Sequence, residues 1–471
     1  MKNLKLEKFK KDIKGKKVAV IGVGISNIPA IKYLVSLGAI VTAHDKNEKL
    51  AQKYEDFKKL GISFVLGQDY LKGLNNYDYI LRSPGIRPFY PEIEEAVKSG
   101  VKITSEIELL IENAPCKVIG VTGSDGKTTT TTLISKFLEE AGYKVWLGGN
   151  IGIPLFSKLD EIEKEDIVVV ELSSFQLMTM KVSPNISIIT NISPNHLDYH
   201  RSFDEYIDAK SNIFLHQNKG DLLVLNCDNE YTKRYLGYVK DNNIKSDIRY
   251  FSVMDHANPG TFLEDGYVVS NINGVEQKIV KISDVKLVGI HNLSNICAAT
   301  SAVLHITGVE PIQKVVTTFM GVEHRMEMFR ILKGVKWYND SIGTSPTRTI
   351  AGLTSFNQKV ILIAGGYDKH IPYDVMGSYI IDKVKTLILV GKTAPKIEKA
   401  VLDEVKKQGL NENEYCDIHN FTSLEECVNY AYSIAKNGDC VVLSPASASF
   451  DLYKNFEERG DLFKSLVNKL S

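Results

Sequence analysis

The stretch Gly120-Val-Thr-Gly-Ser-Asp-Gly-Lys-Thr-Thr129 decides the fold of this 471-residue chain. It follows the apolar pair Val118-Ile119 and precedes the run Thr130-Thr-Thr-Leu-Ile134, which predicts a strand, a glycine loop and a helix. Glycines let the backbone aim its N–H groups at phosphate oxygens, and a helix N-terminus adds partial positive charge. Lys127 can reach the β- and γ-phosphates, and the Thr128 hydroxyl can hold Mg²⁺. The loop therefore predicts a nucleoside triphosphate site, although the strict Walker spacing would place a glycine at position 121.

Length, charge and cysteine usage bound the class of protein. A chain of 471 residues is too long for one core, so two to four domains are expected. Lys plus Arg and Asp plus Glu are equal at 57 each, which argues against a nucleic-acid or membrane-surface partner. The six cysteines lie far apart without a Cys-x-x-Cys pair, as is typical of reduced thiols in a cytoplasmic protein.

The N-terminus superficially resembles a signal peptide, because a basic segment precedes the apolar run Val18–Ile25. That run is short, contains two glycines and has no small-residue cleavage site, so it predicts a first buried strand instead. No apolar run approaches the length of a transmembrane helix.

Short apolar segments alternate with helical patterns along the chain, which predicts βαβ units and parallel sheets. The strands expected in a first unit are Lys17–Ile21, Ile40–His44, Tyr79–Leu81 and Val101–Thr104. After a linker at Ala114-Pro115, the strands expected in a second unit are Val118–Val121, Ile167–Glu171, Ile186–Thr190 and Leu222–Asn226.

The texture changes between Tyr250 and Ile290, where short alternating runs and Asn/Gly turns predict a β-hairpin layer. A helix near Asn292–Thr307 closes the second unit. The strands expected in a third unit are Lys336–Tyr338, Val360–Ala364, Thr386–Val390 and Cys440–Leu443. Gly, Ser or Pro follows each of the last three, at the sheet edge where open α/β folds place their ligands.

The first unit contains a near-match to the dinucleotide fingerprint. Gly22-Val-Gly24 opens it, and Asp45 ends the next strand in the ribose-binding position, but Asn27 stands where the third glycine belongs. A nucleotide-type fold that binds something other than NAD is at least as well supported. Ser83-Pro84-Gly85 follows another strand and could supply further backbone donors to a phosphate.

Polar side chains also follow the strands of the second unit. Glu171 suits Mg²⁺ held jointly with ATP, although Ser173 or Ser174 could instead simply cap a helix. His196 follows the next strand and could be a second metal ligand or a structural histidine. Lys210 lies on a predicted helix, where composition alone suggests a surface lysine.

Taken in order, these motifs resemble those of the Mur ligases of peptidoglycan synthesis. The segments that carry the resemblance span nearly the whole chain: Thr122–Thr128, Gly149–Gly152, Glu171–Leu177, Asn195–Asp198, His291-Asn292, His324-Arg325, Asn339–Ser341 and Leu443–Ser449. Within the family, Glu-Leu-Ser-Ser-Phe-Gln-Leu is similar to the segment of the members that add D-glutamate.

The resemblance implies an α/β protein of three domains. These would be a Rossmann-like UDP-substrate domain (1–114), a central P-loop ATPase-type parallel sheet with a small β layer that binds ATP (115–321), and a Rossmann-like amino-acid domain (322–471). It further implies an ATP-dependent acid–amino-acid ligase that joins D-glutamate to UDP-N-acetylmuramoyl-L-alanine through an acyl phosphate. The expected protein is a cytoplasmic monomer.

The resemblance also implies roles for individual residues. Catalytic roles fall on Lys127, Glu171, His196 and Lys210. Two Mg²⁺ ions would be held by Thr128, Glu171, His196 and Lys210, the lysine being carbamylated by CO₂. ATP would be bound by Gly123, Ser124, Asp125, Gly126, Lys127, Thr128, Thr129, Asn292, Asn295, Arg325 and Asp340. The UDP-substrate would be bound by Gly24, Ile25, Ser26, Asp45, Ser83, Pro84, Gly85, Asn150 and His196. D-Glutamate would be bound by Thr344, Lys369, Ser449 and Phe456.

Two positions depart from some relatives: Asn47 replaces an Arg near uracil, and Ile342 replaces a Lys near the reaction centre. Two other functions stay open. A sibling Mur ligase or a folylpolyglutamate-type ligase would add a different amino acid, but the nucleotide fold of the first unit and Phe175-Gln176 argue against it. A dinucleotide-dependent oxidoreductase would use Gly22 and Gly24, but would leave the loop at Lys127 without a role.

Overall fold

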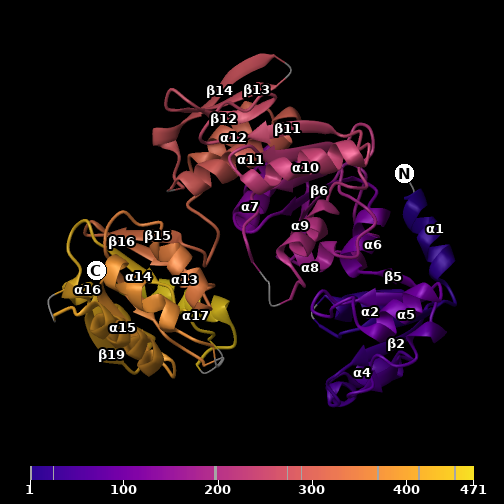
Figure 1. Ribbon diagram of the computed structural model, residues 1–471, viewed down its shortest axis with the longest axis horizontal. Helices are drawn as coiled ribbons and strands as arrows, with labels where there is room; N and C mark the ends of the chain where they lie inside the picture. Colours follow the sequence, from indigo (N-terminus) through magenta and orange to yellow (C-terminus); the bar gives the residue numbers. More distant parts are fainter. Residues whose placement is uncertain are drawn as a thin grey trace. The chain divides into compact units, whose positions relative to one another are not determined.

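The computed structural model describes residues 3–24, 26–195, 199–272, 274–287, 289–368, 371–411, 414–449 and 452–471. The chain divides into two compact units, Met1–Thr318 and Phe319–Ser471 (Figure 1). The first unit holds two β-sheets and the second holds one. The predicted α/β fold with three sheets is confirmed.

The first sheet has five parallel strands in the order β3-β2-β1-β4-β5. They are β1 (Lys17–Ile21), β2 (Ile40–Asp45), β3 (Ser63–Leu66), β4 (Tyr79–Arg82) and β5 (Lys102–Thr104). The helices are α1 (Leu4–Ile13), α2 (Asn27–Ser36), α3 (Leu50–Lys53), α4 (Glu55–Lys59), α5 (Pro91–Lys98) and α6 (Glu106–Asn113), with the 3₁₀ turn η1 (Leu74–Asn76). The strand order reverses between β1 and β4, which is the point where doubly wound sheets bind ligands.

The second sheet has nine strands in the order β14-β13-β12-β11-β10-β9-β6-β8-β7. They are β6 (Lys117–Thr122), β7 (Val145–Gly149), β8 (Ile167–Glu171), β9 (Ile186–Ile189), β10 (Leu222–Asn226), β11 (Asp247–Phe251), β12 (Gly260–Glu264), β13 (Tyr267–Ile272) and β14 (Val275–Lys281). Strands β12 to β14 form an antiparallel meander at one end, which confirms the predicted hairpin layer (Figure 1).

Helices flank this second sheet. They are α7 (Lys127–Glu140), α8 (Ser174–Leu177), α9 (Phe203–Ser211), α10 (Glu230–Asp241), α11 (Ile290–Thr307) and α12 (Val309–Val316), with the 3₁₀ turns η2 (Phe156–Lys158) and η3 (Ile282–Asp284). Helix α11 packs along α7, the helix that begins at the phosphate loop.

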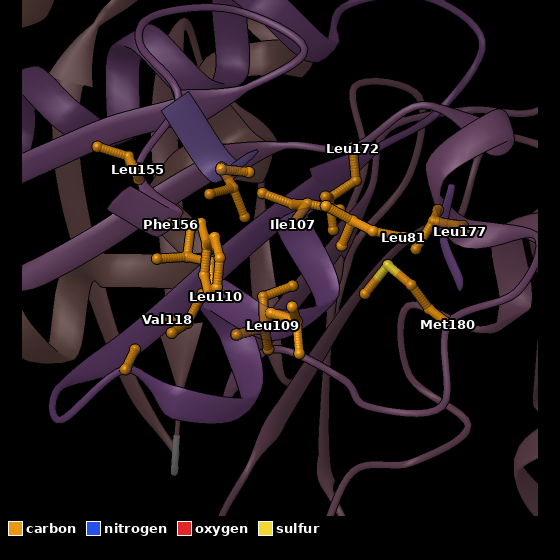
Figure 2. Close-up of a cluster of buried hydrophobic side chains, with 14 of the residues drawn as sticks. Leu81, Ile107, Leu109, Leu110, Val118, Leu155, Phe156, Leu172, Leu177 and Met180 are labelled. Atoms are coloured by element: carbon orange, nitrogen blue, oxygen red, sulfur yellow. The ribbon is translucent and has the colours of Figure 1, made fainter. Parts of the chain in front are cut away.

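A hydrophobic cluster joins the first two sheets (Figure 2). Leu81 comes from β4, Leu109 and Leu110 come from α6, and Leu177 and Met180 come from the segment around α8. Buried apolar area of this kind contributes about 25 cal/mol per Å², so it holds the two sheets together as one unit.

The second unit has six strands in the order β15-β16-β20-β17-β18-β19, with β15 antiparallel and the others parallel. They are β15 (Glu327–Leu332), β16 (Val335–Asn339), β17 (Val360–Ala364), β18 (Val384–Val390), β19 (Asp417–Phe421) and β20 (Cys440–Leu443). Its helices are α13 (Pro346–Leu353), α14 (Gly377–Lys383), α15 (Ala394–Gln408), α16 (Leu424–Ile434) and α17 (Phe456–Lys469), with the 3₁₀ turn η4 (Asp374–Met376).

Alternate residues of β17 enter two different cores in this unit. Leu362 packs in one apolar cluster, whereas Ile361 and Ile363 pack in the other. Side chains of a strand alternate between faces, so both faces of the sheet are buried.

The strands predicted from apolar runs are all present. Strands β3, β7, β11, β15 and β19 were not predicted. All six cysteines are free thiols. Among the helices of the described ranges, none has the length and apolar character needed to cross a membrane.

Candidate nucleotide and metal site

The phosphate loop joins β6 to α7. Gly123 and Gly126 adopt φ values of 150° and 78°, and Gly126 caps α7. A Cβ on Gly123 would lie 1.9 Å from Thr190 Oγ1, so only glycine fits there. The Asn191 side chain accepts a hydrogen bond from the Asp125 N–H at 2.9 Å and donates to the Asp125 carbonyl at 3.1 Å. The loop is thereby held open at a helix N-terminus, a geometry that suits an anion.

Lys127 folds back over this loop. Its ammonium donates to the carbonyl oxygens of Gly123 at 3.0 Å and Ser124 at 2.8 Å. The side chain is therefore already directed across the loop in which a triphosphate would lie.

Two oxygen donors suited to Mg²⁺ meet beside α7. Thr128 Oγ1 donates to Glu171 Oε2 at 2.8 Å, and Asn150 Nδ2 donates to Glu171 Oε1 at 2.7 Å. Glu171 ends β8 and is buried. Ser173 caps α8 in a capping box with Gln176, so the helix cap that the sequence allowed is present beside this carboxylate. A hydroxyl and a carboxylate are ligands that Mg²⁺ accepts, and the residues fit that ion.

Lys210 is buried, and its interpretation as a surface lysine is wrong. Helix α9 places its side chain at 1% exposure, and Nζ donates to Gly123 O at 2.9 Å and Thr122 Oγ1 at 3.2 Å. The ammonium lies 4.6 Å from the ring centre of Tyr206, one helical turn earlier. The Tyr206 hydroxyl lies 2.8 Å from Ser124 Oγ, so α9 touches the phosphate loop twice.

The electrostatic environment disfavours a charged Lys210. Burial lowers the pKa of Lys210 well below its ordinary value, and the nearby Lys127 charge lowers it further, against opposing effects of Glu171 and Asp125. Lys127 and Lys210 donate to the same carbonyl, that of Gly123. Over the described ranges, no carboxylate lies within ion-pair distance of Lys210.

Helix α11 brings two asparagines to the other side of the loop. Asn295 Nδ2 donates to Asn292 Oδ1 at 3.3 Å, and Asn295 Oδ1 accepts from Thr130 Oγ1 at 3.3 Å. A Cβ on Gly126 would lie 2.3 Å from Asn295 Oδ1, so this amide is in direct contact with the loop. Thr129 is buried in the first turn of α7.

The glycine turn after β1 is closed by side chains. Asn27 Nδ2 donates to Gly22 O at 2.8 Å, and the Val23 N–H donates to Asp45 Oδ2 at 2.8 Å. The second Asp45 oxygen accepts from the Asn47 N–H at 2.8 Å. Asn27 therefore stabilises the turn by a hydrogen bond from the position where the dinucleotide fingerprint has glycine. Asp45 stabilises the same turn by accepting hydrogen bonds from main-chain N–H groups.

The remaining residues of this region surround the switch point. Gly24 and Gly85 are exposed, and Ser26 directly precedes α2. The Ser83 N–H donates to Ile21 O at 2.9 Å, which ties the loop after β4 to β1. The Pro84 carbonyl accepts from the Tyr199 hydroxyl at 2.9 Å. Beside this contact is a cavity of about 250 Å³ lined by Arg87, Phe89, Tyr90, Tyr199, His200 and Arg201.

In the second unit, Asp340 follows β16 at the carboxyl edge of the sheet. Its Oδ2 accepts from Ser444 Oγ at 2.6 Å, and its Oδ1 accepts from the Met326 N–H at 3.2 Å. Burial raises the pKa of Asp340 to about 6, while the charge of Arg325 opposes that rise.

Three residues predicted to bind D-glutamate lie in segments at this same edge. Thr344 precedes α13, Ser449 follows β20, and Phe456 begins α17. The Phe456 carbonyl accepts from Ser341 Oγ at 2.7 Å. Ile25, His196 and Lys369 lie outside the described residues.

Sequence reasoning assigned no role to Arg82, Asn191 or Tyr206. Tyr206 lies four residues before Lys210, and residues so spaced share a helix face, so a signal was present. Asn191 lies two residues after the end of β9, the strand next to β6, which is also a recognisable position. Arg82 is the last residue of a short apolar strand, and no sequence motif around it indicates that it is buried.

Family models match all three parts of the chain. Residues 16–105 match the Mur ligase MurD-like N-terminal domain, residues 121–303 the Mur ligase middle domain, and residues 324–447 the Mur ligase glutamate ligase domain. With this fold and phosphate loop, the chain belongs to the Mur ligase family and is a ligase.

Curated relatives match over the full length. The chain is 53% identical to the UDP-N-acetylmuramoylalanine--D-glutamate ligase of Acetivibrio thermocellus, over 99% of both chains. It is 52% identical to the protein of the same name from Ruminiclostridium cellulolyticum, over 99% of this chain and 100% of that one.

Solved structures share the fold at low sequence identity. The UDP-N-acetylmuramate-alanine ligase of Thermotoga maritima is 19% identical with a TM-score of 0.54, covering 96% of this chain and 98% of that chain. A UDP-N-acetylmuramoyl-L-alanyl-D-glutamate--2,6-diaminopimelate ligase is 16% identical with a TM-score of 0.55, covering 98% and 93%.

Proposed function

We propose that this ligase adds D-glutamate to UDP-N-acetylmuramoyl-L-alanine, with conversion of ATP to ADP and phosphate, in the synthesis of peptidoglycan precursors. The observation that carries the proposal is the 53% identity over 99% of both chains with a relative of that named activity. The phosphate loop and the Thr128–Glu171 pair supply the chemistry that such a reaction needs.

The substrate carboxylate attacks the γ-phosphorus of ATP in the first step. An O–P bond forms, the bond to the β-phosphate oxygen breaks, and ADP leaves. Two anions must approach each other, so Lys127 and the N–H groups at the start of α7 hold the charge of the transferred group. Thr128 and Glu171 would hold Mg²⁺, which would supply further neutralisation of the phosphate charge.

The amine of D-glutamate then attacks the acyl carbon. A C–N bond forms, phosphate leaves from the tetrahedral carbon, and the amine proton passes to solvent or a base. No side chain forms a covalent intermediate with the substrate in this route, so the contribution of the chain to this step is orientation of amine and acyl carbon.

Thr128 and Glu171 hold one metal ion in this proposal, and His196 and a carbamate on Lys210 hold a second. The neutral Lys210 amine attacks CO₂, loses a proton and becomes an anion. Its burial and the carbonyl that it shares with Lys127 support this assignment, because both favour the neutral amine over the ammonium. A carbamate on Lys210 would place negative charge beside the Lys127 ammonium, so the two groups would attract each other.

We assign the other ligands by their position in the fold. The turn after β1 and the loop Ser83–Gly85 would bind the UDP-substrate, with Asn150 beside Glu171. Asn292 and Asn295 would contact the adenine, and the carboxyl edge of the second unit would supply Arg325, Asp340 and the D-glutamate residues. The corresponding domains would be 1–114, 115–321 and 322–471.

Phosphate release from ATP in the presence of UDP-N-acetylmuramoyl-L-alanine tests the proposal across a panel of amino acids. D-Glutamate should support release, and L-glutamate, L-lysine and diaminopimelate should not. Release with a different amino acid would identify a sibling ligase. NAD(P)H oxidation without ATP dependence would instead identify an oxidoreductase.

A further inference from the structure

Arg82 is a buried arginine whose charged form is disfavoured by burial and favoured by the nearby Tyr199 and Glu108. It ends β4 and has 0% exposure. No carboxylate of the described ranges forms an ion pair with it, and its Nε has no hydrogen-bond partner. Burying a charge without an ion-pair partner costs free energy of desolvation. We therefore expect Arg82 to have a specific role that offsets this cost.

The guanidinium is instead surrounded by oxygen atoms from two segments far apart in sequence. One nitrogen, Nη1, donates to Ile86 O at 2.6 Å and Ser83 O at 3.3 Å. The other, Nη2, donates to Phe175 O at 2.8 Å and Thr179 Oγ1 at 3.2 Å. Arg82 therefore joins the loop after β4 to helix α8 and the turn that follows it.

Apolar and aromatic contacts pack the same two segments around the arginine, and Tyr199 from a third segment contacts both. Leu81, Leu177 and Met180 lie at one end of the buried cluster (Figure 2). The rings of Phe175 and Tyr199 have centroids 4.0 Å apart, and the Tyr199 hydroxyl bonds Pro84 O. Hydrogen bonds in such a water-poor environment are stronger than at the surface.

We propose that Arg82 is a positioning residue that fixes the Ser83–Ile86 loop against α8 and so sets its distance from Glu171. The inference rests on the proposed function, in which this loop holds the UDP-substrate and Glu171 holds metal and ATP. Glu171 and α8 belong to one short segment, separated by two residues, so a fixed α8 means a fixed carboxylate.

Lysine cannot replace this arginine in the proposed role. The guanidinium is a planar fork with donors on two sides, whereas a lysine ammonium is a single point of charge. Arg82→Lys keeps the charge but can hold only one of the two segments closely. Arg82→Met keeps the length and removes charge and donors.

The test is steady-state kinetics of the full chain with UDP-N-acetylmuramoyl-L-alanine, ATP and D-glutamate, together with thermal unfolding. Arg82→Lys should raise the KM for the UDP-substrate about tenfold and lower kcat, with the KM for ATP changed by less than about twofold. Thr179→Val removes one acceptor on the α8 side and should give a smaller change of the same kind. If the Arg82 variants fail to fold, the kinetics of Thr179→Val test the proposal in their place.

Arg249→Lys is a matched control in the same unit. Arg249 also donates to a main-chain carbonyl, Ser301 O at 2.9 Å, but lies on β11 away from the loop. It should lower thermal stability without moving either KM.

Unchanged KM for the UDP-substrate in Arg82→Lys and Thr179→Val, with a loss of stability like that of Arg249→Lys, would reduce Arg82 to a structural residue. An equal rise of both KM values would overturn the proposal as well. A wild-type chain inactive with D-glutamate would overturn the proposed function itself, and the two failures are therefore separate.

Discussion

At the scale of single residues, the shared acceptor at Gly123 is the informative feature. Two lysines donate to one carbonyl oxygen, and one of them is almost wholly inaccessible to water. Neighbouring like charges in a low-dielectric site repel strongly. The repulsion between the two side chains is therefore removed when Lys210 is neutral, and it becomes an attraction when Lys210 carries a negative charge.

Lys210→Ala should lose most of the ligase activity, because a metal ligand disappears with the carbamate. Added acetate or formate should restore part of it by occupying the vacated oxygen site. Lys210→Arg should not respond to either anion, since it keeps the positive charge and fills the space. Phosphate release with and without added carboxylate measures this. An active Lys210→Ala enzyme would contradict the carbamate assignment.

Lys127→Ala should lower kcat by at least about 10²-fold, because one preorganised cation at the transferred phosphate is removed. The fold should persist, since Lys127 is only half-buried and bonds carbonyls of its own loop. Circular dichroism and phosphate release on the same sample separate the two effects. Lys158→Ala, at an exposed position paired with Glu161, is the control and should behave as wild type.

The phosphate loop could be predicted from the sequence because glycine, lysine and threonine occur in one short run. The role of Lys210 was predicted only from the resemblance to the family. The sequence around it is typical of an exposed helix surface and gives no sign of a buried lysine. Its burial results from Tyr206 and Thr122, which lie on other turns or other elements. Tertiary contacts of this kind leave little trace in local sequence.

At the scale of elements, α6 joins the first two sheets through buried carboxylates. Glu106 Oε1 accepts from the Phe156 N–H at 2.9 Å, and Glu108 Oε1 accepts from the Lys181 N–H at 2.7 Å. Both lie in the first turn of α6, where the helix dipole favours negative charge. Burial nevertheless raises the pKa of Glu106 to about 7, against the effect of the backbone hydrogen bonds.

Glu106→Gln should therefore change how stability depends on pH. With a folded-state pKa raised from 4.5 to about 7, the contribution of Glu106 is fully present below pH 4.5 and is lost as the pH rises through 7. The glutamine does not titrate and keeps an acceptor for Phe156. At pH 8 the variant should be more stable than wild type by about 3 kcal/mol.

Calorimetry between pH 5 and pH 8 measures the effect of Glu106→Gln. Glu112→Gln, at an exposed position on the same helix, is the control and should follow the wild-type curve. If wild type and Glu106→Gln keep a constant difference across that range, Glu106 is not the titrating group.

Elements with continuous apolar runs were predictable, whereas the edge strands β3, β7, β15 and β19 were not. Strands β1, β8 and β17 are covered on both faces, so their sequences are almost wholly apolar. Strand β3 is only partly buried, and β19 mixes polar and apolar residues at an edge. Strand β7 ends in two glycines, because a Cβ on Gly149 would lie 2.2 Å from Glu171 O.

At the scale of the whole molecule, each unit carries its own core. Phe463 packs at 0% exposure in a cluster made only of residues from the second unit. Phe463→Ala should destabilise that unit by about 3–5 kcal/mol through loss of buried area and formation of a cavity.

Differential scanning calorimetry of the full chain should show this as a lowered transition for one unit, with the other transition unchanged. Phe137→Ala, in α7 of the first unit and equally buried, should lower the other transition instead. Equal shifts of the complete profile by either substitution would show that the two units unfold together.

The oxygens that Nη1 of Arg82 holds belong to the main chain, not to side chains. Mutational drift can therefore exchange the side chains around Ile86 while the path of the loop stays the same, as long as the arginine is retained. An inhibitor that binds the amides and carbonyls of this loop would meet the same atoms in each such variant. Resistance would then have to arise at Arg82 itself, at the expense of the loop position that the proposed role of this arginine requires.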